Sequence, residues 1–312
     1  MNLHRTASFV AAAAFAIAVV PAFAQGPVEG PQPTSALINA TSKGDVPLDP
    51  AMLTVQINGK TVPVQSVQKV GAGKAQIVIL IDDGLRSVFA LQLQDMSEFI
   101  MSLPAGTPVM IGYMRDGGVV SPTRGFTTDH KAAVDSLRIP LSSPGISASP
   151  YFCLQELVKH WPTSVPGPRY VLMMTNGVDP YNGSTSILNQ DSPYVQQAQE
   201  DAQRAGVAVY SIYYGEAGMR GGRANFSGQA YLSQIAEATG GYSLYQMNGN
   251  PVSIGPYLDD FAKHIDESYQ VSFMADNGRS KPGTLQGFKV KTTQPGVKVH
   301  GPESVRPGLL LQ

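Results

Sequence analysis

The alternation of short apolar runs with segments of helical periodicity, between residues 74 and 268, most constrains the fold of this chain. The run QIVILI at 76–81 is rich in β-branched residues, which is typical of a strand buried on both faces. Apolar residues then recur at helical spacing from Phe89 to Ile100. Further strands are predicted at 109–113, 170–174, 207–213 and 243–245, and further helices at about 129–137, 152–161, 195–204, 231–238 and 256–267. This order predicts an α/β, doubly wound, mostly parallel and Rossmann-like sheet.

Small β-elements are predicted on both sides of this region. The alternating segments 53–57 and 60–64 flank Asn58-Gly59, which is the strongest short-range signal for a hairpin. Alternation at 269–274, 287–293 and 297–300 predicts a small antiparallel appendage that packs with the hairpin. The predicted organisation is a signal peptide at 1–24, a disordered Pro/Gly linker at 25–35, a β-hairpin segment at 36–73, the α/β domain at 74–268 and a β-tail at 269–312.

The first residues have the layout of a secretory signal peptide. Arg5 precedes an apolar run at 9–20, and Ala22-Phe23-Ala24 supplies small residues where a signal peptidase reads them. Cleavage is expected after Ala24, which predicts a periplasmic or secreted protein. The apolar run is shorter than the roughly 20 residues that span a bilayer, so no stable membrane insertion is expected.

Composition limits the classes of partner. The net charge is −1 and charged residues make up 14% of the chain, which argues against the clustered basic face of a nucleic-acid-binding protein. A protein or glycan partner suits this composition better. Cys153 is the single cysteine, so no intramolecular disulfide forms. Its place at the start of a predicted helix favours a buried, inert thiol over an intermolecular or reactive one.

The loops at the carboxyl ends of the predicted strands are the expected binding edge. Ligands of open α/β sheets bind there, where successive connections leave in opposite directions. These loops are 82–87 after the first strand, 175–179 after the third, and the Ser-rich segment 142–149 between them. The candidate partner-binding residues are Asp82, Asp83, Arg86, Ser149, Asn176 and Asp179.

A strand that ends in Asp82, a helix, and a later strand that ends in Thr175-Asn176-Gly177 together resemble the von Willebrand factor type A fold. The resemblance covers about 53–308 and is to the exported acidobacterial type, in which a short β-segment precedes the domain and a β-tail follows. It implies an adhesion-type module that binds and does not catalyse.

The family's metal-ion-dependent adhesion site has the pattern Asp-x-Ser-x-Ser, a Thr before a mid-domain helix and a later Asp. Asp82 matches the first position, but Gly84 and Arg86 occupy the two hydroxyl positions and Asn176 replaces the later Asp. The Thr position falls near Ser147 or Ser149, and a register shifted to Asp83 recovers only Ser87. The residual candidate ligands are Asp82, Ser87, Ser147, Ser149 and Asn176.

These losses predict a degenerate site without a bound metal or another cofactor. Mg²⁺ requires nearly octahedral oxygen coordination, so each missing ligand counts. A guanidinium at Arg86 adds a repulsion of roughly 4 kcal/mol per unit charge at ~4 Å and an effective dielectric of about 20. Two interpretations of Arg86 stay open. In the first, Arg86 replaces the cation, pairs with Asp82 or Asp83, and donates from its guanidinium to a carboxylate of a partner. In the second, Arg86 points to solvent.

Enzyme motifs are absent or misplaced in the sequence. The segment GAGK at 71–74 precedes a strand where a phosphate-binding loop would follow one, and no Gly-x-Ser-x-Gly elbow occurs. The function expected is an exported, non-enzymatic module that recognises a macromolecule through its edge loops, including the polar loop 179–186 with Tyr181 and Tyr194 nearby. A divalent-cation-dependent adhesin and a secreted hydrolase on a doubly wound sheet are the two alternatives.

Overall fold

The computed structural model describes residues 30–311 apart from 43–46, 72, 86, 143–148, 183–190, 216–220, 248, 278–280 and 282. The predicted signal peptide, Arg86 and Ser147 therefore lie outside the described residues, as does the side chain of Ser87. A six-stranded sheet and two four-stranded sheets make up the β-structure of the described chain.

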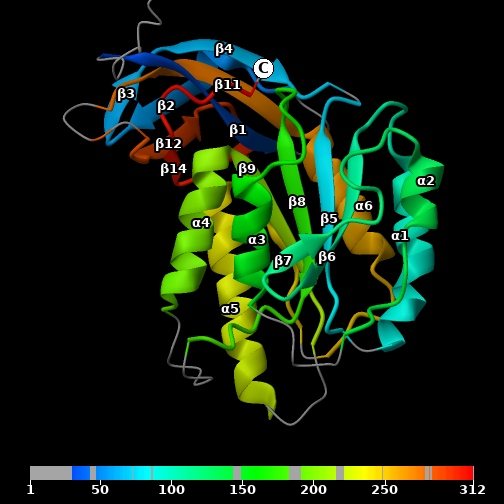
Figure 1. The fold of residues 1–312 in the computed structure, drawn as a ribbon. Coiled ribbons are helices and arrows are strands. Elements are labelled where there is room, and N and C mark those ends of the chain that lie inside the picture. Colours follow the sequence, from blue (N-terminus) through cyan, green and yellow to red (C-terminus); the bar gives the residue numbers. More distant parts are fainter. Residues whose placement is uncertain are drawn as a thin grey trace, which may run out of the picture.

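The central six-stranded sheet confirms the predicted α/β class. Its order is β10-β9-β8-β5-β6-β7, and every neighbouring pair is parallel except β6 with β7. The strands are β5 (Gln76–Asp82), β6 (Val109–Arg115), β7 (Gly118–Val120), β8 (Arg169–Thr175), β9 (Val207–Tyr213) and β10 (Ser243–Tyr245). β5, β8 and β9 are almost wholly buried because helices cover both faces of the sheet (Figure 1).

Side chains of alternate residues of β5 enter two separate cores. Ile77, Ile79 and Ile81 pack with α1 (Leu93–Ser102), α2 (His130–Asp135) and α6 (Gly255–Asp266). Val78 and Leu80 pack with α3 (Pro150–Lys159), α4 (Pro193–Ala205) and α5 (Gly221–Thr239). A strand whose two faces are both apolar fits this three-layer arrangement, because neither face meets water.

Three helices differ from the prediction at their amino ends. A 3₁₀ segment, η2 (Ser87–Gln92), precedes α1. α2 begins at His130 and not at 129, because Asp129 is its N-cap and its carboxylate accepts a hydrogen bond from the Ala132 amide. α5 begins ten residues earlier than the predicted start at Tyr231. The earlier part was not predicted as helix because it contains three glycines, at its first two positions and at Gly228, and glycine is unfavourable in helices. Gly206, in the left-handed backbone conformation, ends α4.

The flanking elements form two facing four-stranded antiparallel sheets. One has the order β13-β1-β11-β4, with β13 (Val297–His300), β1 (Gln32–Ser42), β11 (Ser268–Ala275) and β4 (Val64–Lys69). The other has the order β14-β12-β2-β3, with β14 (Ser304–Val305), β12 (Gln286–Thr292), β2 (Leu53–Ile57) and β3 (Lys60–Val62), and the short helix η1 (Pro50–Met52) precedes β2. A shared apolar core joins the two sheets, so the predicted hairpin and tail do pack together.

Strand β1 is the main difference in this part of the chain. It begins at Gln32, inside the segment predicted to be a linker, and it lies between β11 and β13. Its polar residues made it resemble a loop in sequence, yet Thr34, Ser35 and Asn39 are buried. The Thr34 hydroxyl donates to the Gln32 carbonyl at 2.9 Å, and the Asn39 side-chain amide donates to the His264 carbonyl at 2.7 Å.

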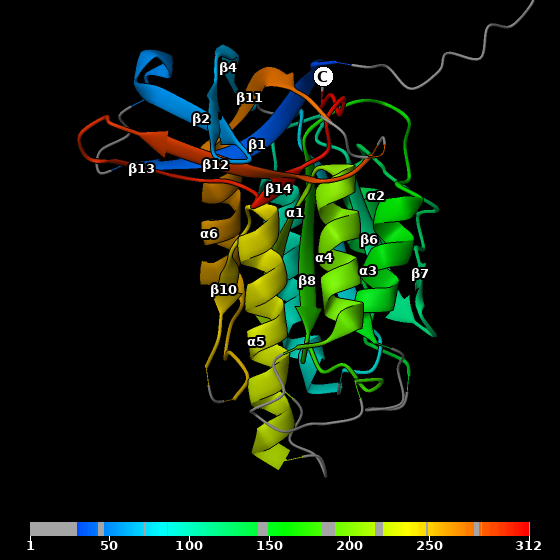
Figure 2. The same cartoon turned by 90° about the vertical axis from the view of Figure 1, so that its left-hand side faces the viewer.

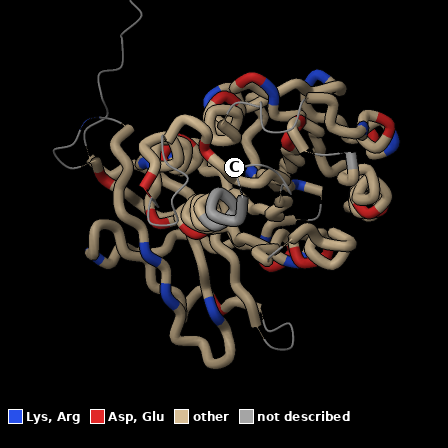
Figure 3. The backbone as a smooth tube through the Cα atoms, turned by 90° about the horizontal axis from the view of Figure 1, so that it is seen from below, with Lys and Arg blue, Asp and Glu red and all other residues tan. Residues whose placement is uncertain are grey.

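The two four-stranded sheets lie over the amino ends of the parallel strands, which leaves the carboxyl edge on the opposite side of the molecule (Figures 1 and 2). One backbone hydrogen bond between the two parts runs from the Glu303 amide, between β13 and β14, to the Ala238 carbonyl of α5 at 2.9 Å. Seen from the carboxyl edge, acidic and basic residues are interspersed (Figure 3). Within the described part of the chain, no helix combines the length and the apolar character that a bilayer crossing needs.

Candidate functional site at the carboxyl edge

The strand order places the switch point of the sheet between β5 and β8. Numbered from the first strand of the sheet, the order is 3-2-1-4-5-6, which is that of doubly wound dinucleotide-binding sheets. The chain leaves β5 towards β6 on one side and later returns to β8 on the other. The loops after β5 and β8 therefore diverge, and Asp82 and Thr175 end these two strands.

The Asp82 carboxylate is buried and held by donors of the protein itself. The Thr175 hydroxyl donates to its Oδ2 at 2.7 Å, and the Gly84 amide donates to its Oδ1 at 2.9 Å. The Gly177 amide in turn donates to the Thr175 hydroxyl at 3.2 Å. These hydrogen bonds join the loop after β5 to the loop after β8 at the carboxyl edge of the sheet.

Asp83 lies beside Asp82 but faces the other side of the sheet. Its fully buried carboxylate accepts hydrogen bonds from Arg138 Nη1 at 2.6 Å, the Leu141 amide at 2.9 Å and the Ser142 hydroxyl at 3.2 Å. Burial raises the pKa of Asp83, but these hydrogen bonds and the Arg138 charge outweigh burial and hold the pKa below 3.8. The guanidinium also lies 3.7 Å from the centre of the Tyr113 ring.

The cation beside Asp83 is thus Arg138, which the sequence prediction did not single out. Sequence spacing offers no signal for it, because Arg138 lies 55 residues from Asp83 in a loop after α2. Since Asp83 has three donors and no exposed surface, its carboxylate fixes the fold of segment 138–142 and is not available to a partner.

Ser149, Asn176 and Asp179 stabilise local backbone structure. The buried Ser149 caps α3, and Asn176 Oδ1 accepts a hydrogen bond from the Val178 amide at 2.9 Å. Asp179 Oδ2 accepts from the Ser192 hydroxyl at 2.7 Å, and Oδ1 accepts from the Tyr181 amide at 3.2 Å. Asn176 is the one of the three that is not buried.

Gly177 fixes how closely helix α5 approaches the loop after β8. It has a φ of +65°, and a Cβ at this position would lie 2.4 Å from the Gly228 carbonyl oxygen. A Cβ on Gly228 would lie 2.0 Å from the Asn176 carbonyl oxygen. The Tyr151 hydroxyl also donates to the Gly177 carbonyl at 2.6 Å. The loop after β8 is therefore in contact with α5 on one side and with α3 on the other.

Among the described residues, the oxygens at the switch point do not fit a divalent cation. Both oxygens of Asp82 accept hydrogen bonds from the protein, and the neighbouring position offers the Gly84 amide, which is a donor and not a ligand. Ser149 Oγ and Asn176 Oδ1 accept from backbone amides. In the described part of the chain no three His, Cys, Asp or Glu side chains gather closely enough to hold a metal ion. Mg²⁺ needs about six oxygens, so no step is assigned to a metal.

A cluster of three aromatic side chains stands at the same edge. Phe152 of α3 lies 5.2 Å from Tyr181 and 5.0 Å from Tyr194, measured between ring centres, and the two tyrosines are 6.4 Å apart. Tyr181 is 55% exposed and Tyr194 is 36% exposed. The sequence pointed to both tyrosines but missed Phe152, because its contact with them arises only when α3 packs beside α4.

The fold is similar to that of several solved structures, whereas no protein-family model and no curated protein matches the sequence. A von Willebrand factor type A protein from Catenulispora acidiphila is 12% identical with a TM-score of 0.44, over 88% of this chain and 74% of that one. The von Willebrand factor domain of the type V pili tip protein Mfa5 from Porphyromonas gingivalis is 10% identical with a TM-score of 0.45, over 63% of this chain and 96% of that one. The pilus adhesin SpaC from Lactobacillus rhamnosus GG is 11% identical with a TM-score of 0.47, over 86% of this chain and 49% of that one.

The one thiol of the chain is placed as the sequence predicted. Cys153 is buried in the core between the sheet and α3. Burial raises the pKa of its thiol to about 12, so the thiolate that a nucleophile or a metal ligand requires does not form near neutral pH.

Proposed function

We propose that this chain is an exported, non-enzymatic module that binds a macromolecular partner, a protein or a glycan, through the carboxyl edge of its sheet and without a metal. The observation that carries the proposal is the cluster of the half-buried Phe152 with the exposed Tyr181 and Tyr194, beside a switch point whose carboxylates are hydrogen-bonded within the protein. Tyrosine is favoured on recognition surfaces because its large ring buries much area at little cost in side-chain entropy.

The cluster is held in place before a partner arrives. Asp179 joins the loop that contains Tyr181 to Ser192 at the start of α4, and the Asn182 amide donates to the Tyr231 hydroxyl at 2.6 Å. A surface that is already ordered loses less conformational entropy when it binds, so more of the contact energy becomes affinity.

The chemistry of the edge supports binding over catalysis. Asp82 and Asp83 have their oxygens engaged by protein donors, and the thiol of Cys153 is buried and protonated. Neither a free general base nor an activated nucleophile stands at the described switch point, and hydrolysis by a residue pair requires one of these.

The test replaces both exposed tyrosines. The double variant Tyr181→Ala and Tyr194→Ala is used with wild type to capture partners from an envelope extract and to probe a glycan array. The matched control is Leu91→Ala with Met101→Ala, two exposed apolar residues at η2 and α1. We expect a partner that wild type and control retain and that the tyrosine variant loses by at least about tenfold, since aromatic residues dominate such contacts. Equal retention by all three proteins would contradict the proposal.

A further inference from the structure

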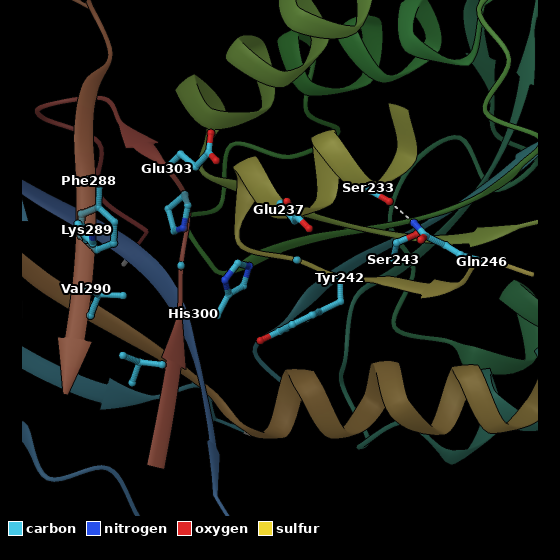
Figure 4. Close-up of a pocket in the computed structure, with 14 residues that line it drawn as sticks. Ser233, Glu237, Tyr242, Ser243, Gln246, Phe288, Lys289, Val290, His300 and Glu303 are labelled. Carbon is cyan, nitrogen blue, oxygen red and sulfur yellow. Dashed lines mark hydrogen bonds between the residues drawn. The ribbon is translucent and has the colours of Figure 1, made fainter. Parts of the chain in front are cut away.

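A pocket of about 760 Å³ lies where the α/β domain meets the two four-stranded sheets, far from the carboxyl edge. One wall comes from α5 and β10, and the other comes from β12, β13 and the segment that follows β13 (Figure 4). Its size falls in the range of about 300–1,000 Å³ that is usual for small-ligand sites, and such sites favour the junctions between domains.

One side of the pocket is apolar. Val290 and Val299 come from β12 and β13, and the Tyr242 ring closes this side. Tyr242 is fixed in position, because its ring stacks on His264 at 4.2 Å with an interplanar angle of 13° and lies 4.9 Å from His300. The wall therefore offers aliphatic and aromatic surface for an alkyl chain.

The side chains of Gln246, Ser233 and Ser243, which line the pocket, already use their hydrogen-bond donors. The Gln246 amide donates to the Ser233 hydroxyl, and the Ser233 hydroxyl donates to the Gln229 carbonyl at 3.0 Å. The Ser243 hydroxyl shares a 2.9 Å hydrogen bond with Ser211. An anion that took hydrogen bonds from these three side chains would have to break the bonds that they already make.

The acceptors, in contrast, are available. Glu237 and Glu303 are both exposed, and neither carboxylate has a hydrogen bond or an ion pair with another described residue. The Glu303 amide donates to the Ala238 carbonyl at 2.9 Å, which brings the two glutamates to the same end of the pocket. Both act electrostatically on His300, the last residue of β13. The buried Nε2 of His300 also lacks a hydrogen-bond partner in the described chain.

The net charge of the lining is negative. Lys289 is the one cationic residue that lines the pocket, and it alternates along β12 with Phe288 and Val290, so its side chain leaves from the opposite face of the strand. Burial lowers the pKa of His300, which keeps its imidazole neutral near pH 7. The two carboxylates are therefore not neutralised by the protein.

We propose that this pocket binds a cation carried on an alkyl chain, an ammonium or a guanidinium, with its charge between Glu237 and Glu303 and its methylene groups against Val290, Val299 and Tyr242. The side chain of a lysine or arginine in a polypeptide has this chemistry, and so does a free polyamine. Long cationic side chains bury their stems on apolar surface in this way while the charged group stays hydrated or paired.

The experiment follows backbone amide signals of the protein by NMR while ligands are added. The probes are acetyl-Gly-Arg-Gly-amide, acetyl-Gly-Lys-Gly-amide and putrescine, with acetyl-Gly-norleucine-Gly-amide as the uncharged match. We expect saturable shifts at Tyr242, Gln246 and Glu303 with the cationic probes. The double variant Glu237→Gln and Glu303→Gln should weaken their binding by about tenfold, because it removes two charged acceptors.

Glu98→Gln, an exposed glutamate on α1 at the other face of the sheet, is the matched control and should bind as wild type does. The concentration dependence of the shifts gives the affinity of each probe. Tighter binding of the peptides than of putrescine assigns the site to a polypeptide, and the reverse assigns it to a polyamine. The proposal is overturned if no probe shifts these signals at 10 mM, a concentration at which even millimolar affinity gives near-saturation. It is also overturned if norleucine matches the cations, or if the double variant binds like wild type.

Discussion

The Thr175 hydroxyl donates a 2.7 Å hydrogen bond to the Asp82 carboxylate across the ends of the neighbouring parallel strands β8 and β5. Both residues are buried, and the bond bridges the point where the chain connections diverge. A carboxylate at the switch point of such a sheet is a natural place to hold a ligand. Here the protein's own hydroxyl and the Gly84 amide occupy it.

Thr175→Val should therefore weaken the fold. It keeps the shape of the side chain but removes the donor to Asp82 and the acceptor for the Gly177 amide. We expect a loss of roughly 1–3 kcal/mol in the free energy of unfolding, because buried polar groups lose a partner. Denaturation in urea measures it. Thr175→Ser keeps the hydroxyl and should lose less, and equal losses would show that the hydrogen bond contributes nothing.

Asp83 and Arg138 should be strongly coupled. The carboxylate is fully buried and the Arg138 side chain is 28% exposed, so solvent screens the pair only in part. A double-mutant cycle with Asp83→Asn and Arg138→Met should give a coupling energy of about 1–3 kcal/mol. The exposed pair Lys131 and Asp135 is the control and should give less than about 1 kcal/mol. Comparable values for the two pairs would contradict the structural role assigned to Asp83.

The junction between the domain and the flanking sheets should weaken in mild acid. Burial lowers the pKa of both His264 and His300 from 6.5, although Asp260 opposes this at His264 and Glu237 and Glu303 oppose it at His300. The unfolded chain then binds protons more readily than the folded one. The stability that the neutral imidazoles provide is complete above pH 6.5 and is lost as the pH falls through the lowered folded-state pKa.

Thermal unfolding at pH 7.5 and pH 5.5 measures this effect. Wild type should show a lower midpoint at pH 5.5. The double variant His264→Gln and His300→Gln should lose most of the difference, whatever its stability at pH 7.5. An unchanged difference between the two pH values would assign the acid sensitivity to other groups.

Gly228→Ala should displace α5 from the loop after β8. The added methyl would lie 2.0 Å from the Asn176 carbonyl oxygen, and both are fixed to the backbone. We expect a destabilisation of about 1–3 kcal/mol, typical of overpacking. Gly255→Ala at the start of α6, whose nearest neighbour would be a side-chain oxygen 3.3 Å away, should cost far less. Urea denaturation of both variants tests the contrast.

Much of the fold followed from periodicity, and the rest depended on contacts between distant residues. The apolar run at 76–81 predicted a strand buried on both faces, and β5 is one. β1 was missed because its buried Thr34, Ser35 and Asn39 look like loop residues until their hydrogen-bond partners are placed. The early start of α5 was missed because glycine is unfavourable in helices unless close packing requires it.

The position of the loops at the strand ends followed from the sequence, but the contacts within these loops did not. Asp82 and Asn176 do lie at neighbouring strand ends, as strand order requires. Sequence order does not reveal that Thr175 bonds to Asp82 or that Arg138 returns to Asp83, since both are contacts over more than fifty residues. The pocket between α5 and β13 also escaped prediction, because it forms only when the two parts of the chain meet.

Isothermal titration calorimetry with Mg²⁺, Mn²⁺ and Ca²⁺, on wild type and on Asp82→Asn, tests most directly whether the switch point works without a metal. The hydrogen bonds around Asp82 predict no saturable heat for either protein up to millimolar ion. Submillimolar binding by wild type that Asp82→Asn abolishes would contradict this account, and the carboxyl edge would then be a cation-dependent site.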